Sequence, residues 1–473
     1  MRFDEHFITG ALSNVSILHG TFPRSTQFSI DSRTLQEGDI FIALSGEQVD
    51  GHTFIQQVLQ AGAAGCIIAA DKKVVLDSVD PEFLKSKLII VVPDTLTALF
   101  RLASAWRAQF TYPVIGITGS VGKTSTKELL AHILTMNGKK VIASFGNQNT
   151  KIGLSLNILR MRPSHDVAVF EMGISKRGEM AELAQLVRPT TAIITCIGHQ
   201  HMDGLGSLND IALEKRDIFK YFTEESIGII NGDQSILAHV SYSHPVVKFG
   251  SKTTNQVQAR KINPEGSTIH FLLKLYKKKY AMTLNRPHVG AVFNSLAAAT
   301  AAYLLGVPDE IIVEAIQNAP EVSGRFEQRP LKKVQGIVIN DCYNANPESM
   351  KAALLALESI ETSAQKIAVL GDMLGLGVNS PFWHRQLGRF LRKVPSLKQV
   401  ILVGDLVKWT EDWLPTGVSA VRVATWQQAV EVLDQYLASE SLVLVKGSLG
   451  VGLGNLVQEI SVDKRVKKSQ ISL

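Results

Sequence analysis

Short runs of apolar residues alternate along the chain with segments whose apolar residues recur at helical spacing. Runs at residues 114–117, 167–173 and 192–198 have the length and content of buried strands. A helical segment at residues 128–134 follows the first of them. Because strands that alternate with helices form parallel sheets, this pattern predicts a doubly wound, mostly parallel sheet over residues 94–321.

The alternation continues on both sides of this central unit. A chain of 473 residues is too long for one core and suggests about three domains. We therefore expect an α/β protein with a small N-terminal α/β domain (1–93), a central domain (94–321) and a C-terminal Rossmann-like domain (322–473). The outer two domains rest on strand-like runs at residues 38–44, 65–69, 87–92, 336–341, 366–370, 399–403 and 442–445.

One tract of the central unit departs from this pattern. Residues 267–284 alternate roughly between apolar and polar side chains and carry many lysines. Such a tract is typical of an antiparallel ribbon with one face in water. Helix-forming sequence returns at residues 291–305.

Composition restricts the class of protein. No apolar run approaches the roughly 18 residues of a membrane span, and the first six residues lack the order of a secretion signal. Cys66, Cys196 and Cys342 are few and far apart, as in a reduced compartment. The net charge of +6 is spread along the chain, which is weak support for nucleic-acid binding. We expect a cytoplasmic monomer that binds small molecules, with no nucleic acid and no membrane span.

The most informative motif joins the strand-like run at 114–117 to the helix after it. Its two glycines let successive backbone N–H groups point at an anion, and the helix adds the positive end of its dipole. Lys123 can reach outer phosphates, and the Thr124 hydroxyl can bind magnesium. Ile117 stands where the strict P-loop pattern has glycine, and the alternative is an ordinary strand-to-helix turn. The predicted phosphate site consists of Gly119, Ser120, Val121, Gly122, Lys123, Thr124 and Ser125.

A bound nucleotide needs a divalent cation, and the ends of two other predicted strands offer ligands for it. Glu171 ends one strand, and His199 and His201 follow the other. Ligands gather beyond the carboxyl ends of parallel strands. Thr124, Glu171 and His201 are therefore candidate metal ligands, although each could also be a structural residue.

Ser32 and Arg33 precede the predicted strand at 38–44. A hydroxyl and a guanidinium in this place could hold a phosphate or a uracil. The alternative is an Asp-Ser turn with a surface arginine, and spacing alone does not choose between them.

The phosphate motif by itself allows kinase, GTPase, ATPase or ligase chemistry. Asp203-Gly-Leu-Gly206 imitates a GTPase switch, but no Asn-Lys-x-Asp guanine reader follows it, which excludes that class. Two further α/β domains favour an enzyme that joins two substrates and excludes water by closing.

A series of motifs, taken together, resembles the Mur ligases, ATP-dependent amide-forming enzymes of peptidoglycan precursor synthesis. The resemblance covers nearly the whole chain and is less specific in the first 90 residues. Within the family, the chain resembles the members that join D-alanyl-D-alanine to a UDP-N-acetylmuramoyl-tripeptide. The motifs are Thr118-Gly-Ser-Val-Gly-Lys-Thr124, Gly146-Asn-Gln-Asn149, Phe170-Glu-Met-Gly173, His201-Met-Asp-Gly-Leu-Gly-Ser207, the segment around Lys215, Gly324-Arg-Phe326, Asp341-Cys-Tyr-Asn-Ala-Asn-Pro347, Leu370-Gly-Asp-Met373 and Val445-Lys-Gly-Ser448.

The resemblance implies a reaction through an acyl phosphate, with ATP and two Mg²⁺ ions as cofactors. Lys123, Glu171, His201 and Lys215 would be the catalytic residues, with Thr124 and Glu171 on one ion. Lys215 would react with CO₂ to give a carbamate, which would share the second ion with His201. Without the resemblance, Lys215 would be a helix-surface residue paired with Glu214 or Asp217.

The resemblance also implies the rest of the site. Asn294 would contact the adenine, and Arg325 and Asp341 would reach the nucleotide from the third domain. Asn149 and Thr150 would border the sugar-peptide substrate, whereas Asn344 and Asn346 would lie near the dipeptide or the nucleotide. Each of these side chains could instead have a turn or capping role.

The chain departs from the family pattern at Gly290-Ala291, Thr150, Gly375 and Leu449. These positions affect the adenine and dipeptide contacts rather than the class of reaction. The alternatives are another Mur-type or folylpolyglutamate-type amide ligase, and a P-loop phosphotransferase or regulatory nucleotide-binding module. The sequence does not identify the third residue of the tripeptide.

Overall fold

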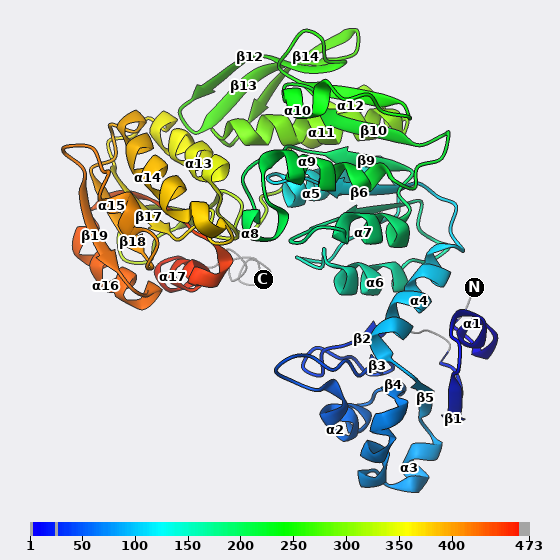
Figure 1. The fold of residues 1–473 in the computed structure, drawn as a ribbon. Coiled ribbons are helices and arrows are strands. Elements are labelled where there is room, and N and C mark those ends of the chain that lie inside the picture. The colour runs from blue at the N-terminus through cyan, green and yellow to red at the C-terminus, as the bar shows by residue number, and fades with distance from the viewer. Residues whose placement is uncertain (1–2, 24–26, 463–473) are drawn as a thin grey trace, which may run out of the picture.

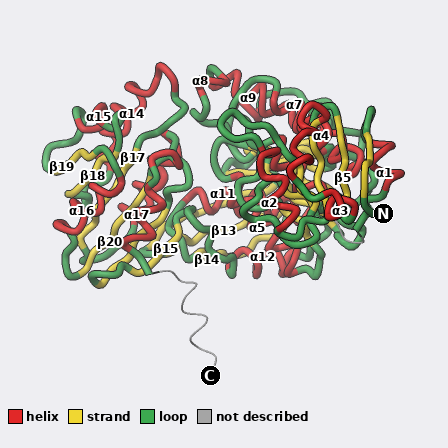
Figure 2. The backbone as a smooth tube through the Cα atoms, turned by 90° about the horizontal axis from the view of Figure 1, so that it is seen from below, coloured by secondary structure: helices red, strands yellow, loops and turns green. Residues whose placement is uncertain are grey.

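Three separate sheets organise the chain in the computed structural model, which describes residues 3–23 and 27–462. They contain five, nine and six strands in chain order. Figure 1 shows each sheet in its own lobe, with the N-terminal lobe below the middle lobe and the C-terminal lobe beside it. Figure 2 also places the C-terminal lobe beside the other two. The predicted α/β class with three mostly parallel sheets is confirmed, and the exact boundaries at residues 93 and 321 stay predictions.

The N-terminal sheet has the strand order β1-β5-β4-β3-β2, and β1 is its antiparallel member. Two of its strands match the predicted runs closely, whereas the run at 38–44 forms a shorter strand because a turn precedes it. Its elements are α1 (Glu5–Ala11), β1 (Ser16–His19), β2 (Phe28–Ser29), β3 (Ile40–Ile42), α2 (Ile55–Gln60), β4 (Gly65–Ala69), α3 (Pro81–Lys85) and β5 (Leu88–Val92).

Helix α4 (Thr95–Arg107) connects the N-terminal and middle lobes. The Asp94 side chain caps it by accepting a hydrogen bond from the Thr97 N–H at 2.6 Å. Near its end, the Trp106 ring stacks on Phe3 at 3.9 Å between centroids, and its indole N–H donates to the Met161 carbonyl. One continuous apolar core therefore joins the two lobes.

The middle sheet has the order β14-β13-β12-β11-β10-β9-β6-β8-β7. It is parallel from β7 to β12. β13 and β14 form the antiparallel ribbon predicted at 267–284, and β12, which was not predicted, pairs antiparallel with β13. Its strands are β6 (Val114–Thr118), β7 (Val141–Ala143), β8 (Val167–Glu171), β9 (Thr191–Ile194), β10 (Ile227–Asn231), β11 (Val246–Gly250), β12 (Val257–Glu265), β13 (Thr268–Leu275) and β14 (Lys278–Leu284).

The helices of the middle lobe place the phosphate motif at the centre of the sheet. β6 is buried along its whole length between β8 and β9, so the motif that follows it leaves the carboxyl edge between two neighbouring strands. The helices are α5 (Lys123–Met136), α6 (Lys151–Leu159), α7 (Glu179–Val187), α8 (Met202–Leu205), α9 (Leu208–Arg216), α10 (Ser235–Ala238), α11 (Val289–Leu304) and α12 (Asp309–Gln317).

The C-terminal sheet has the order β15-β16-β20-β17-β18-β19, and all its pairs are parallel except β15 with β16. This is the predicted Rossmann-like arrangement. No helix within residues 3–23 and 27–462 is both long and apolar enough to span a bilayer. The elements are β15 (Glu327–Pro330), β16 (Gln335–Asn340), α13 (Pro347–Ser359), β17 (Gln365–Gly371), α14 (Ser380–Phe390), β18 (Gln399–Val403), α15 (Lys408–Glu411), β19 (Ser419–Val423), α16 (Trp426–Tyr436), β20 (Glu440–Lys446) and α17 (Leu453–Ile460).

Candidate functional site

A cavity of about 990 Å³ lies between the middle and C-terminal lobes. Its wall brings together predicted residues that are up to 226 positions apart in the chain, from Ser120 to Asn346. Gly119, Thr124, Lys215, Ser32 and Arg33 are not among the residues that line it. The predicted residues on the wall are Ser120, Val121, Gly122, Lys123, Ser125, Asn149, Thr150, Glu171, His201, Asn294, Arg325, Asp341, Asn344 and Asn346.

The phosphate loop, residues 118–124, is shaped by its two glycines. Gly119 and Gly122 have φ angles of 147° and 88°, which side chains disfavour. A Cβ at Gly122 would also lie 2.3 Å from Oδ1 of Asn294. Helix α5 begins at Lys123, so its free N–H groups face the cavity side of the loop.

Lys123 folds back over this loop. Its Nζ donates a hydrogen bond to the Gly119 carbonyl at 2.7 Å. Burial lowers the pKa of the Lys123 ammonium, and the Glu171 carboxylate acts against that shift. The side chain lines the cavity and would need only to exchange a carbonyl for a phosphate oxygen.

Glu171 ends β8 with a carboxylate that is only partly satisfied. The residue is 1% exposed, and its Oε1 accepts a hydrogen bond from Nδ2 of Asn149 at 2.8 Å. Oε2 is buried and has no hydrogen-bond partner in the part of the chain that the structure describes. A buried carboxylate oxygen without a donor is costly, and a cation would satisfy it.

The groups around Glu171 suit a magnesium ion that takes waters and substrate phosphates as ligands, and not an ion held by protein side chains alone. Among residues 3–23 and 27–462, no three His, Cys, Asp or Glu side chains are arranged to hold an ion. Magnesium is usually bound by one or two carboxylates, waters and substrate phosphates. One carboxylate beside a phosphate loop fits that pattern.

Lys215 lies in α9 and is 1% exposed, so the prediction of a helix-surface residue from spacing alone was wrong. It has no ion pair with Glu214, whose carboxylate instead accepts hydrogen bonds from the N–H groups of Gly178 and Met180 at 3.0 Å. Burial, reinforced by the charge of Lys123, lowers the pKa of Lys215 to about 7. A large fraction of this amine is therefore neutral near neutral pH.

His201 lies beside these lysines with a left-handed backbone, at φ 51°. Burial lowers the pKa of its imidazole, and the charges of Lys123 and Lys215 lower it further. A neutral imidazole is the form that binds metal ions.

Arg325 reaches the phosphate loop from the start of the C-terminal lobe. Its Nη2 donates to the Thr124 hydroxyl at 2.9 Å, and its guanidinium stacks on the Tyr343 ring at 4.0 Å. Its Nε is buried without a hydrogen-bond partner among the described residues. This unsatisfied donor supports an anionic ligand at the same place.

Asp341 is paired with a residue to which the sequence analysis gave no role. Lys446 is buried and holds Oδ2 of Asp341 at 2.7 Å, while Oδ1 accepts from the Phe326 N–H. The sequence could have pointed to Lys446, since this residue lies in the motif at 445–448. Tyr343, the platform under Arg325, was missed in the same way within the motif at 341–347.

The turn and capping roles considered for the polar residues are present at three of them, Thr150, Asn344 and Asn346. Thr150 caps α6 and Asn346 caps α13, each through its side-chain oxygen. Oδ1 of Asn344 accepts from the Ala345 N–H at 2.8 Å. All three also line the cavity, so their contacts with substrate stay predictions.

Ser32, which is half-buried, and Arg33, which is exposed, lie in a turn that is not part of the cavity lining. Arg33 is 84% exposed in its side chain and binds both carboxylate oxygens of Asp31, at 2.9 and 2.7 Å. These bonds lower the pKa of Asp31 to about 2. A role for Ser32 and Arg33 in substrate binding stays a prediction.

Comparisons with known proteins agree with this geometry. The Mur ligase middle domain matches residues 117–302, the glutamate ligase domain of Mur ligases matches 324–449, and the Mur ligase family catalytic domain matches 25–107. The UDP-N-acetylmuramoyl-tripeptide–D-alanyl-D-alanine ligase of Bacillus subtilis is 32% identical over 96% of both chains. The enzyme of the same name from Treponema pallidum is 34% identical over 90% of this chain and 92% of its own.

Solved structures show the same arrangement of lobes. MurF from Acinetobacter baumannii superposes with a TM-score of 0.82 at 28% identity, covering 97% of this chain and 98% of that one. A MurF ligase from Thermotoga maritima in complex with ADP gives a TM-score of 0.77 at 26% identity, covering 92% and 96%.

The fold and the cavity define a three-lobed α/β ligase with a central phosphate loop. The chain belongs to the Mur ligase family.

Proposed function

We propose that this chain joins D-alanyl-D-alanine to UDP-N-acetylmuramoyl-tripeptide at the expense of ATP, as a cytoplasmic monomer. The observation that carries the proposal is the cavity in which the phosphate loop faces the C-terminal lobe. Relatives with this activity in their names match over 79% to 96% of the chain. The free cysteines Cys66, Cys196 and Cys342 are consistent with a reduced compartment.

The phosphate loop is the proposed binding site for ATP. Backbone N–H groups at the start of α5 and the Lys123 ammonium would hold its β- and γ-phosphates. Asn294 lies against Gly122 on the side from which α11 enters the cavity, which is consistent with an adenine contact. The ADP complex of the Thermotoga maritima relative supports a nucleotide at this place.

The residues present fit magnesium. The free Oε2 of Glu171 and the Thr124 hydroxyl would hold one ion once Arg325 moves from Thr124 to a phosphate. Bound magnesium neutralises charge on the transferring phosphoryl group. Lys215 as an amine cannot bind a cation, but its neutral form can add to CO₂, releasing one proton and leaving a carbamate that can bind beside His201.

The chain's own groups would direct two chemical steps. A carboxylate oxygen of the tripeptide attacks the γ-phosphorus and ADP leaves, while Lys123 stabilises the phosphoryl oxygens. The amine of the dipeptide then attacks the acyl carbon, loses a proton, and inorganic phosphate leaves. The lobes around the cavity would exclude water, which would otherwise hydrolyse the acyl phosphate.

A product assay tests the proposal. The purified protein is incubated with ATP, Mg²⁺ and UDP-N-acetylmuramoyl-tripeptide, and is offered D-alanyl-D-alanine or single amino acids in parallel. We expect phosphate release and a product heavier by one dipeptide residue with D-alanyl-D-alanine alone. A product with a single amino acid would assign another Mur-type activity, and nucleotide binding without any amide product would contradict the ligase. Light scattering during size-exclusion chromatography measures the molar mass in solution and tests whether the protein is a monomer.

A further inference from the structure

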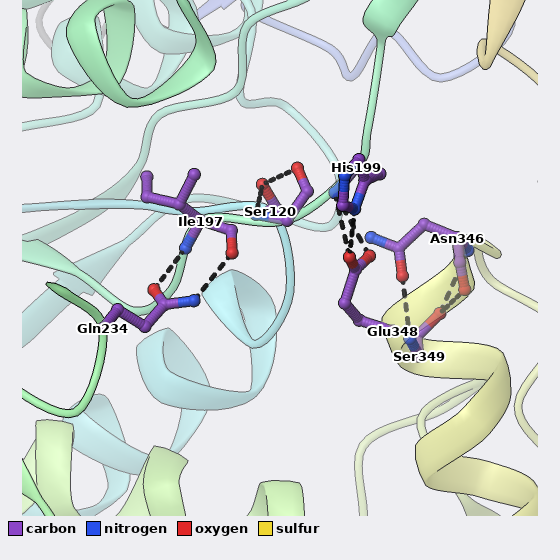
Figure 3. Close-up of polar contacts among 8 residues, drawn as sticks. Ser120, Ile197, His199, Gln234, Asn346, Glu348 and Ser349 are labelled. Carbon is purple, nitrogen blue, oxygen red and sulfur yellow. Dashed lines mark hydrogen bonds and ion pairs between the residues drawn. The ribbon is translucent and has the colours of Figure 1, made fainter. Parts of the chain in front are cut away.

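A polar bridge joins the phosphate loop to the C-terminal lobe beside the cavity. His199, in the segment after β9, meets Glu348, in the first turn of α13 (Figure 3). Nδ1 of His199 lies 2.5 Å from Oε1 of Glu348. The backbone N–H of His199 donates to both carboxylate oxygens at 3.2 Å. The Trp383 ring of α14 packs against the imidazole at 4.2 Å between centroids.

On the middle-lobe side, the bridge is tied to the phosphate loop itself. Ser120 accepts a hydrogen bond from the Gly198 N–H and donates one to the Gly198 carbonyl, both at 2.9 Å through its hydroxyl. The side-chain amide of Gln234 binds the N–H and the carbonyl of Ile197 at 2.7 and 2.8 Å. Gly198, just before His199, is therefore fixed to the loop that would hold ATP, and Ile197 is fixed to the segment after β10 (Figure 3).

On the C-terminal side, the bridge is tied to the proposed dipeptide site. Glu348 stands between Asn346 and Ser349, whose reciprocal hydrogen bonds form the cap of α13. Asn346 lines the cavity, whereas His199 and Glu348 are not part of its lining. A carboxylate in the first turn of a helix is also favoured by the helix dipole.

We propose that His199 and Glu348 are positioning residues, which hold the C-terminal lobe at the distance from the phosphate loop that the second step requires. The inference rests on the proposed function and extends it to a pair of residues that touch neither substrate. Without the bridge, the backbone around Ser120 and Lys123 keeps its position in the middle lobe. Asn346, in contrast, loses one of the contacts that hold it near the phosphate loop. The bridge therefore acts on the use of the dipeptide more than on the binding of ATP, because Arg325, which reaches the phosphate loop from the C-terminal lobe, keeps its own hydrogen bond to Thr124.

The pair is suited to a test because its side chains are 23% and 39% exposed and can be replaced without opening a core. His199→Ala, Glu348→Ala and the double variant are compared by steady-state kinetics. We expect kcat/KM for D-alanyl-D-alanine to fall about 10-fold in Glu348→Ala and no further in the double variant, because both lose the whole bridge. The loss should be smaller in His199→Ala, because the backbone N–H of residue 199 still donates to Glu348. The Kd of a fluorescent ATP analogue should change less than twofold.

Two matched variants separate the bridge from general damage. Glu348→Gln keeps an oxygen that accepts from the His199 N–H, so it should recover most of the activity that Glu348→Ala loses. Glu358→Ala removes a different carboxylate of α13, one that accepts hydrogen bonds from Ser396 within the C-terminal lobe. This variant should behave as the parent. The proposal would be overturned if Glu358→Ala lost as much activity as Glu348→Ala, or if the losses of the two single variants multiplied in the double variant. It would also be overturned if kcat/KM for D-alanyl-D-alanine did not change in the bridge variants.

The radius of gyration of the ligand-free proteins, measured by small-angle X-ray scattering, makes the two proposals separable. We expect it to be larger in Glu348→Ala than in the parent and in Glu358→Ala. A parent that forms no amide product refutes the proposed function, and in that case the scattering comparison alone decides whether the bridge holds the lobes. Equal radii in all three proteins would then refute it.

Discussion

The phosphate loop of the middle lobe and the turn at residues 31–33 of the N-terminal lobe present their cationic side chains in opposite ways. Lys123 is half-buried, follows a buried central strand and is held by the carbonyl of its own loop. Arg33 is exposed and already neutralised by Asp31, two residues away. The loop was predicted to bind phosphate, and the turn either to bind a phosphate or a uracil or to be structural, but only the loop lines the cavity described above.

The difference shows what a local motif can specify. The loop's shape follows from a strand, two glycines and a helix start that are adjacent in the chain, so its ligand-binding geometry exists before any ligand arrives. The turn satisfies its guanidinium locally, so a substrate must displace Asp31 to bind it. We therefore expect substitutions in and behind the loop to affect catalysis strongly and substitutions in the turn to affect one KM modestly.

The largest effect is expected for Lys123→Ala. Removing the charge that faces the transferred phosphoryl group should lower kcat about 10³-fold, because no other lysine lies on the loop. Release of phosphate and formation of the amide product are measured together. Lys139→Ala, an exposed lysine beyond the end of α5, is the control. Product formation at the parent's rate in Lys123→Ala would remove the loop from the mechanism.

Lys215→Ala should lower kcat about 10²-fold or more, and added formate or acetate should restore part of the activity by supplying the missing carboxylate. Lys220→Ala, an exposed lysine nearby in the sequence, should have no effect. If Lys215→Ala retains full activity, the residue has no part in metal binding.

The lowered pKa of Lys215 also predicts the pH dependence of carbamate formation. Below its pKa of about 7 the amine is protonated and cannot add to CO₂, and above it the neutral form dominates. In the metal-free protein, the carbamate signal from ¹³C-labelled bicarbonate should therefore decline as the pH falls from 8 to 6. A signal that is independent of pH across this range would contradict the neutral amine.

Gly122→Ala should weaken ATP binding about 10- to 100-fold and lower the free energy of unfolding by about 1–3 kcal/mol. Its positive φ and the 2.3 Å approach of Asn294 both penalise a side chain. Gly138→Ala is a matched control, because Gly138 has a φ of 75° but open space around it. Chemical denaturation and nucleotide titration measure both variants, and equal behaviour would exclude the contact with Asn294 as a cause.

The smallest effect is expected for Arg33→Ala. If the turn contacts the UDP substrate, KM for that substrate should rise about 10-fold with kcat unchanged, because a single exposed charge adds little to binding in water. Lys85→Ala, which breaks the exposed pair of Lys85 with Glu82 in the same lobe, is the control. An unchanged KM would leave the turn with its structural role alone.

Much of the fold could be predicted because its signals are local. The parallel strands are continuous apolar runs, such as β18, and the ribbon of β13 and β14 shows alternate buried residues. Less could be predicted where one residue ends an element. The strand expected at 38–44 is confined to Ile40–Ile42, because the flanking hydrogen bonds decide where a strand ends.

The candidate site also has parts that local sequence signals predict and parts that they do not. The motifs identified the loop, Glu171 and Lys215, but spacing alone would have placed Lys215 on a helix surface, since burial depends on what covers that face. The pairing of Lys446 with Asp341, the stacking of Arg325 on Tyr343 and the contact of His199 with Glu348 join segments far apart in the chain or in different lobes. No local pattern reports such contacts.

By itself, the sequence determined the phosphate loop, the α/β class and the resemblance to Mur ligases, because each depends on residues that are neighbours in the chain. The tertiary structure alone decided which side chains face each other across the cavity and which charges are buried. The physical reason is that desolvation and pairing depend on distance in space, as the lowered pKa of Lys215 and the free oxygen of Glu171 show.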